Sequence, residues 1–221
     1  NIHNFIKLIE ICDKIIFPSE NIFKNYSKYI DLKNFISKKK IFVVNHMDKL
    51  INNDFLVIPE ILNINNNIDN NNIKTINIGF IGNFTKYKGS NLLKKLADEE
   101  KIFKDNYKIN YHIFGSCEDE NENENKNKKF INNIIYHDTY CDETIINDLY
   151  NNNIHGILHL SEFEESYCYA LTNSINSGIP IFYLNHGSFK ERLIKKDKYF
   201  PAENNNFIEV FYNFLDFIIE N

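Results

Sequence analysis

Residues 75–82 read TINIGFIG, and residues 90–100 read SNLLKKLADEE. The first stretch is mainly apolar and ends in glycine, which predicts a buried strand of a parallel sheet. The second stretch has apolar residues at helical spacing, and Ser90 is predicted to be the N-cap of this helix. A buried strand followed closely by a helix is the repeating unit of a parallel α/β sheet, because parallel neighbours need a crossover connection.

The same alternation continues to the end of the chain. Further strands are predicted at Ile109–Gly115, Asn133–Tyr136, Ile154–Leu160 and Ile179–Leu184. Helices are predicted at Asp142–Tyr150, with Asp142 as its N-cap, and at Tyr167–Ser177 and Phe207–Ile219. Short connections favour right-handed crossovers. We therefore expect an α/β fold, a doubly wound, Rossmann-like parallel sheet over residues 75–221. Ligands of such sheets bind beyond the C-terminal ends of the strands.

Residues 1–74 are expected to form a short α/β segment. Strand patterns occur at Cys12–Pro18 and Lys40–His46, and a helix is predicted to start at Ser19 and Glu20. Two strands and one helix are too few for an independent domain, so the segment should dock onto the main sheet or onto a partner domain. Asn63–Asn72 is typical of a linker and Glu118–Lys129 of a solvated loop. Because the first residue is Asn rather than Met, we expect a fragment of a longer polypeptide.

Composition excludes several classes of partner. The 221 residues carry a net charge of −5, which argues against a nucleic-acid or anionic membrane surface. No apolar run reaches the roughly 20 residues of a transmembrane helix. The four cysteines form no CxxC pair, which is typical of reduced thiols in a cytoplasmic protein and predicts no metal site.

The first candidate site is the turn from Gly82 to Gly89 (GNFTKYKG), between the first strand and its helix. A lysine beside a glycine can bring an ammonium group and backbone N–H groups to a phosphate. The spacing is neither GxGxxG nor a P-loop, and an ordinary strand-to-helix turn explains it equally well.

A second junction, SEFEESYCYALTN at residues 161–173, is more informative. Its carboxylates precede a helix and could simply complement the helix dipole. In the alternative interpretation, Glu165 accepts hydrogen bonds from sugar hydroxyls while helix N–H groups bind a phosphate. A third junction, Asn185–Ser188 followed by Glu191 and Arg192, comes after the next strand. His112 and His159 lie on apolar strands and are expected to be core histidines.

Together these pieces resemble the GT-B glycosyltransferases of the family 4 type. That family carries a G-x-x-x-x-x-KG turn, then E-x7-E, then a small-residue helix end with G-x-P, and later a glycine turn followed by Glu. Here the matching pieces run from Gly82 to Lys88-Gly89, from Glu165 to Asn173, through Ser177-Gly178-Ile179-Pro180, and to His186-Gly187 with Glu191. The resemblance covers residues 75–195, and the upstream FPSE and VVNHMD segments resemble the last strands of the family's N-terminal domain.

The resemblance implies a role for each matching residue. Lys88 would contact the donor diphosphate and Glu165 the donor sugar, as the candidate catalytic residue. The backbone of Ser166, Tyr167 and Cys168 would lie near the phosphates. Asn173 stands where a second Glu binds ribose in the family, and Asn83 stands where an arginine usually assists the lysine. Lys86 is a candidate to compensate for that missing charge.

The implied activity is transfer of a sugar from a nucleoside-diphosphate sugar to an acceptor hydroxyl, with retention and without an obligatory metal or other cofactor. Residues 75–221 would be the donor-binding domain and residues 1–74 the end of the acceptor-side domain. A glycan, lipid or protein acceptor would be bound through an N-terminal half that this chain lacks. Two alternatives stay open: a non-catalytic nucleotide-sugar-binding module, and a nucleotide-sugar epimerase of the same architecture.

Overall fold

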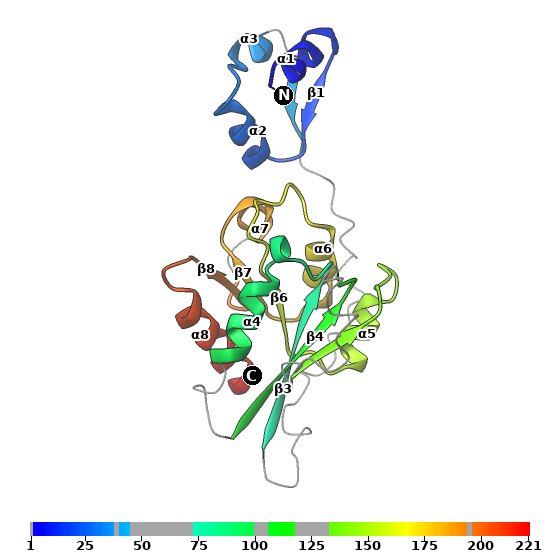
Figure 1. The fold of residues 1–221 in the computed structure, drawn as a ribbon, viewed down its shortest axis with the longest axis vertical. Coiled ribbons are helices and arrows are strands. Elements are labelled where there is room, and N and C mark those ends of the chain that lie inside the picture. Colours follow the sequence, from blue (N-terminus) through cyan, green and yellow to red (C-terminus); the bar gives the residue numbers. More distant parts are fainter. Residues whose placement is uncertain (1, 38–39, 45–72, 100–105, 118–132, 194–195) are drawn as a thin grey trace.

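A computed structural model describes residues 2–37, 40–44, 73–99, 106–117, 133–193 and 196–221 (Figure 1). Its main feature is a six-stranded parallel sheet with the order β5-β4-β3-β6-β7-β8. The strands are β3 (Lys74–Ile81), β4 (Tyr107–Phe114), β5 (Ile134–His137), β6 (Gly156–His159), β7 (Ile181–Leu184) and β8 (Tyr199–Ala202). The chain thus builds the sheet outward from β3 in one direction and then from β6 in the other, as in doubly wound nucleotide-binding folds.

Helices cover both faces of this sheet. On one face, α4 (Ser90–Glu99) and α8 (Phe207–Glu220) bury the largest apolar cluster, which includes Leu93 and Phe211. On the other face, α5 (Ile145–Asn151), α6 (Tyr169–Ser177) and α7 (Gly187–Arg192) cover two smaller clusters. Burial on both faces explains why the strands are almost uniformly apolar.

The predicted fold class is confirmed, and each strand and helix predicted after residue 74 is present. Two predicted N-caps are wrong. Ser90 is the first residue of α4 itself, because a 3₁₀ turn, η3 (Lys86–Lys88), precedes that helix. Asp142 does not cap α5, which begins at Ile145 and follows Thr144, because its carboxylate instead accepts a hydrogen bond from Asn173. The short elements η3, α7 and β8 were not predicted, since stretches of so few residues show no clear periodicity.

The N-terminal segment has a small core of its own. It contains α1 (Ile2–Ile11), β1 (Ile15–Phe17), α2 (Glu20–Ser27), α3 (Lys33–Ser37) and β2 (Ile41–Val43), with β1 and β2 paired in parallel. Apolar side chains from these elements gather between them, Ile9 and Phe17 among the most buried. Both predicted strands and the predicted helix are confirmed. Figure 1 shows this segment at one end of the molecule, with α2 on the side nearest α7.

The structure does not test three predictions about the organisation of the chain. The Asn-rich linker at 63–72 and the acidic loop at 118–129 lie outside the described residues. The division of the chain into domains at 74/75 stays a prediction. Among the helices that the structure describes, none is long and apolar enough to cross a membrane.

Histidines are built into the interior of the sheet domain. His155 accepts a hydrogen bond at Nδ1 from the backbone N–H of Asn77 at 2.9 Å. His112 on β4 shares a hydrogen bond with His137 at the end of β5, with 3.0 Å between Nδ1 and Nε2. Burial lowers the pKa of His112 to about 4, helped by the neighbouring His137 and His155, and burial lowers the pKa of His155 to about 4. These side chains are therefore neutral in the folded protein at physiological pH.

This arrangement predicts a protein that loses stability in mild acid. In the unfolded chain a histidine titrates near pH 6.5, whereas His112 and His155 in the fold titrate near 4. The unfolded state therefore binds more protons between these values, so the stability is fully present above pH 6.5 and declines as the pH falls toward 4. Two such groups contribute a slope of up to about 3 kcal/mol per pH unit.

Urea unfolding at pH 7.5, 6.0 and 5.0 measures this slope directly. The variant His112→Gln is expected to be less sensitive to acid by about 1.4 kcal/mol per pH unit, the share of one titrating group. An unchanged slope in that variant would show that groups other than His112 control the acid sensitivity.

Candidate functional site

A pocket of about 350 Å³ opens at the C-terminal ends of β3 and β6. These two strands are neighbours in space, and they lie where the strand order of the sheet reverses. That point is where doubly wound sheets bind their ligands. The part of the pocket that bears on chemistry is lined by Gly82, Asn83, Lys88, Tyr140, His159, Glu165, Ser166, Tyr167 and Cys168.

The turn after β3 places Lys88 at the pocket. Thr85 caps η3, since its hydroxyl accepts a hydrogen bond from the backbone N–H of Lys88 at 3.3 Å. Gly89 ends the turn with a φ of +94°, in the left-handed region that favours glycine. A Cβ atom at Gly89 would lie 2.2 Å from the carbonyl oxygen of Leu160, so the turn packs directly against the end of β6. The lysine is therefore held by a fixed backbone.

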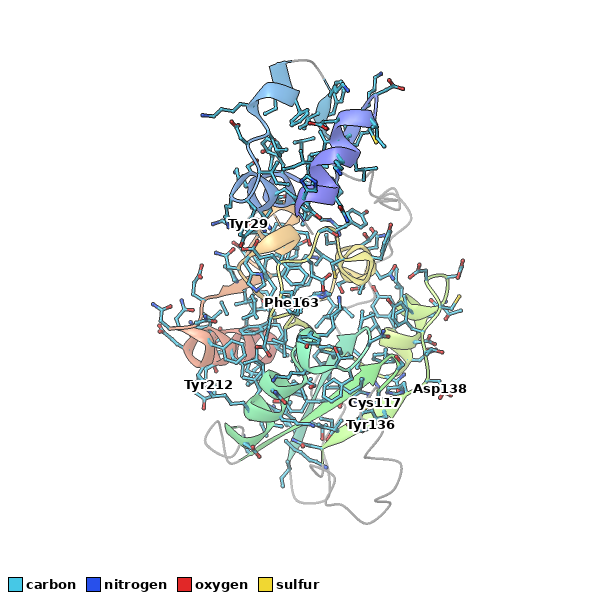
Figure 2. All side chains as sticks on the ribbon, turned by 45° about the horizontal axis from the view of Figure 1, so that its top comes forward. Tyr29, Cys117, Tyr136, Asp138, Phe163 and Tyr212 are labelled. Atoms are coloured by element: carbon cyan, nitrogen blue, oxygen red, sulfur yellow. The ribbon has the colours of Figure 1, made fainter. Side chains whose placement is uncertain are left out.

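The loop between β6 and α6, residues 160–168, is the second wall of the pocket. It is tied to the first turn by the backbone N–H of Glu162, which donates to the carbonyl of Tyr87 at 3.0 Å. Across the pocket, the Lys88 ammonium forms a salt bridge with the Glu165 carboxylate. The rings of Tyr87 and Phe163, on these two segments, have centroids 5.0 Å apart and both are exposed; Phe163 is labelled in Figure 2.

Arg192, at the end of α7, fixes the last part of this loop. Its Nη1 atom donates to the carbonyl of Tyr167 at 2.6 Å and to that of Cys168 at 2.8 Å, while Nη2 donates to the Thr172 hydroxyl at 2.7 Å. The guanidinium group also lies over the Tyr167 ring, 4.1 Å from its centroid. One side chain thus holds the turn in which Cys168, with a φ of +62°, leads into α6.

The third junction, at the start of α7, packs against the backbone of this loop. Gly187 begins α7 with a φ of +55°, and a Cβ atom there would lie 2.8 Å from the backbone nitrogen of Glu165. The next residue, Ser188, donates its backbone N–H to the carbonyl of Glu165 at 2.9 Å. The backbone of Glu165 is therefore packed against α7, and its side chain faces the pocket.

Most of the residues predicted from the sequence meet in this pocket. Gly82, Asn83, Lys88, Glu165, Ser166, Tyr167 and Cys168 all line it. Lys86 is exposed on η3 and does not line it, and Gly89 packs against Leu160 instead. Asn173 is buried on α6, where its amide donates to Asp142 at 2.8 Å. The side-chain amide oxygen of Asn83 accepts a hydrogen bond from the Ser116 hydroxyl at 2.8 Å.

Two further residues at the pocket were not predicted to be functional. Tyr140 follows β5, and burial, with nearby Asp142 and Cys168, raises the pKa of its phenol. His159 is buried, as expected for a core histidine, and its Nε2 lies 2.8 Å from the Ser174 hydroxyl. Burial, Arg192 and Lys88 lower the pKa of His159 to about 3, so it is neutral. The only signal for both in the sequence was their place at a strand end.

The Cys168 thiol in the pocket wall is not activated as a nucleophile, and the charged side chains Lys88 and Glu165 pair with each other. Burial raises the pKa of the Cys168 thiol to about 11, with a smaller contribution from Glu165, so the thiolate is scarcely populated at neutral pH. Lys88 and the first turn of α6 are the positive groups that face the cavity. Within the described residues, no group of three or more His, Cys, Asp or Glu side chains is placed to hold a metal ion.

Comparison with known proteins gives a match in structure but not in sequence. No family model and no curated protein sequence matches the chain. Among solved structures, the chain is similar to TarM with a TM-score of 0.70 and 14% identity, covering 99% of this chain and 39% of that one. The catalytic domain of starch synthase IV from Arabidopsis thaliana, bound to ADP and acarbose, gives a TM-score of 0.62 and 12% identity over 96% of this chain and 50% of that one.

A third similar structure is HepE from Anabaena in complex with UDP, with a TM-score of 0.58 and 14% identity over 94% of this chain and 54% of that one. The chain therefore spans between 39% and 54% of these three proteins. Its six-stranded sheet and its pocket at the strand ends agree with the expectation drawn from the motifs. The chain has the fold of a GT-B glycosyltransferase C-terminal domain, Rossmann-like, with a short α/β segment before it.

Proposed function

We propose that this chain is the donor-binding part of a glycosyltransferase that moves a sugar from a nucleoside-diphosphate sugar to an acceptor hydroxyl. The observation that carries the proposal is the meeting of Lys88 and Glu165 across a pocket that also receives the start of α6. A cation and helix N–H groups suit a diphosphate. A carboxylate beside them suits sugar hydroxyls, because a charged acceptor makes the stronger hydrogen bond.

The similar structures support the same ligand class. An S. aureus TarM variant was crystallised with UDP, and HepE with UDP-glucose. For this chain we propose that a nucleoside diphosphate lies with its phosphates between Lys88 and the turn at Ser166–Cys168. The sugar would then extend toward Glu165. Binding would exchange the Lys88–Glu165 ion pair for a lysine–phosphate contact and a carboxylate–hydroxyl contact.

In the reaction we propose, the acceptor oxygen bonds to the anomeric carbon while the bond from that carbon to the diphosphate oxygen breaks. The electron pair leaves with the diphosphate, and the acceptor proton passes to a phosphate oxygen, with retention at the anomeric centre. Lys88 and the α6 N–H groups would stabilise the charge that develops on the leaving group. Glu165 would orient the sugar. The acceptor would be held by protein outside this chain.

Calorimetry of the chain with UDP, ADP, GDP and dTDP tests the donor site. We expect saturable binding of one nucleotide, weakened in Lys88→Ala by about 10- to 100-fold, the value of a hydrogen bond to a charged group. Lys95→Ala, an exposed lysine on α4, is the matched control and should bind like the wild type. Equal affinity in Lys88→Ala, or no binding of any nucleotide by the wild type, would contradict the proposal.

One observation favours a second candidate, a nucleotide-sugar-binding module without catalysis. Asn83 and Asn173 stand where the family carries charged residues, and their side chains are occupied by Ser116 and Asp142. Nucleotide-sugar binding without turnover in a protein that contains the acceptor-side half would favour the module. Transfer to an acceptor by the same protein would exclude it.

A further inference from the structure

Helix α2 of the N-terminal segment is docked onto the sheet domain through its first turns. The backbone N–H of Asn21 donates to the Glu191 carboxylate on α7 at 2.6 Å, and the Asn21 side-chain amide donates to Glu164 at 2.8 Å. The side-chain amide of Asn25 donates to the same oxygen of Glu164. Two carboxylates of the sheet domain therefore meet the positive end of the α2 dipole. In both views the N-terminal segment, which carries Tyr29, lies beside the end of the sheet domain that carries Phe163 (Figure 2).

The amides that hold Glu164 are themselves fixed in place. Ser19 caps α2 through its hydroxyl, which accepts from the backbone N–H of Ile22 at 3.2 Å. One turn further along α2, the Lys28 ammonium donates to the side-chain amide oxygen of Asn25 at 2.7 Å. This contact directs the amide nitrogen of Asn25 toward Glu164. The hydrogen bonds from Asn25 and Asn21 lower the pKa of Glu164, so the carboxylate is held in its charged form.

Glu164 is adjacent to Glu165, and their two side chains have different partners. Glu164 bonds to α2, whereas Glu165 bonds to Lys88 inside the pocket. Between them the backbone is packed against Gly187, where a Cβ atom would lie 2.9 Å from the Cα of Glu164. This piece of loop is therefore held by α7, through Gly187 and Ser188, and by α2, through Glu164.

We propose that α2 is a latch for the donor pocket: its docking keeps Glu165 directed toward Lys88. Asn21 and Asn25 are positioning residues that act through their hydrogen bonds to Glu164. When α2 undocks, the loop at residues 162–166 loosens and the pocket binds a nucleotide less tightly. Coupling of this kind is reciprocal, so a bound nucleotide strengthens the docking of α2. The predicted change in nucleotide affinity rests on the donor site proposed above, whereas the predicted loosening of residues 162–166 does not.

The test uses the full chain and the double variant Asn21→Ala/Asn25→Ala. Both side chains lie at the surface, so the unfolding midpoint of the sheet domain should not change. Asn213→Ala, an exposed asparagine on α8, is the matched control. Hydrogen exchange of the peptides that cover residues 161–168, measured without ligand, should be several-fold faster in the double variant than in the control. The affinity for the nucleotide bound by the wild type should fall about three- to tenfold.

A double-mutant cycle shows whether the asparagines act through Glu164. Adding Glu164→Ala to the double variant should change neither exchange nor affinity further, because the contact is already lost. Exchange rates in the double variant equal to those in Asn213→Ala would overturn the latch. If the wild type binds no nucleotide, the donor-site proposal fails by itself, and the exchange rates alone then decide the latch.

Discussion

Gly89→Ala is expected to destabilise the sheet domain by at least about 4 kcal/mol, within the range that a forced backbone displacement produces. Gly89 has a φ of +94°, and a Cβ atom there would lie 2.2 Å from the carbonyl oxygen of Leu160 and 2.4 Å from the Leu160 Cβ. Neither atom belongs to a flexible side-chain end, so the turn after β3 and the end of β6 must separate. Because Lys88 and Glu165 sit on these two segments, the pocket should open as stability falls.

The control for this prediction separates the clash from the conformation. Gly178 also has a positive φ, +73°, but a Cβ atom there would meet only the Lys198 ammonium at 3.7 Å. Gly178→Ala should therefore cost about 1 kcal/mol, the penalty of the left-handed conformation alone. Urea unfolding of both variants gives the comparison. Similar losses in the two would show that β6 and the turn do not approach each other as closely as the structure has them.

The order of strands and helices was predictable because each buried strand is apolar on both faces and ends at a glycine or a polar turn. On β3, Ile76, Ile78 and Phe80 are buried in the cluster on one face and Ile81 in the cluster on the other, as the apolar sequence predicts. In the sheet domain the elements that escaped prediction are short or depend on tertiary contacts, whereas α1 (Ile2–Ile11) in the N-terminal segment was missed although it is ten residues long. β8 carries only Tyr199–Ala202, and α7 has its N-cap at His186, which forms no side-chain capping bond.

For the site, the sequence predicted which residues lie at one edge of the sheet but not what their side chains contact. The turn positions of Lys88 and Glu165 follow from their place after β3 and β6, and both residues line the pocket. The contact between Asn173 and Asp142 could not be predicted, because these residues are 31 positions apart and meet only through the packing of α5 and α6. The docking of Asn21 on Glu164 is likewise a contact between distant segments.

These long-range contacts converge on one loop. Residues 160–168 are held to the first turn through Tyr87, to α7 through Ser188, to α2 through Glu164 and to the end of α7 through Arg192. The loop has no regular secondary structure of its own, so its conformation depends on these partners. A substitution that removes one of them should therefore affect the pocket, and removal of a side chain that forms several of these bonds should also lower stability.

Arg192→Met is expected to have the largest effect of this kind, a loss of about 3 to 5 kcal/mol, because carbonyl groups that accept hydrogen bonds from a charged donor are left unsatisfied. Arg192 donates to the carbonyls of Tyr167 and Cys168 and to the Thr172 hydroxyl, all within 2.8 Å. Without it, the turn at Cys168 loses the bonds that hold its left-handed conformation. Any nucleotide affinity that the wild type shows should fall with it, since this turn lines the pocket.

Two companion variants decide whether geometry or charge is responsible. Arg192→Lys keeps the charge but offers a single nitrogen, which cannot reach both carbonyls and the hydroxyl, so it should recover less than half of the lost stability. Lys190→Met, on the exposed side of the same helix, should change stability by less than about 0.5 kcal/mol. Urea unfolding of the three variants tests this, and full recovery by lysine would show that the loop needs only a nearby positive charge. Recovery of less than half would instead identify the planar guanidinium as the group that shapes the turn at Cys168.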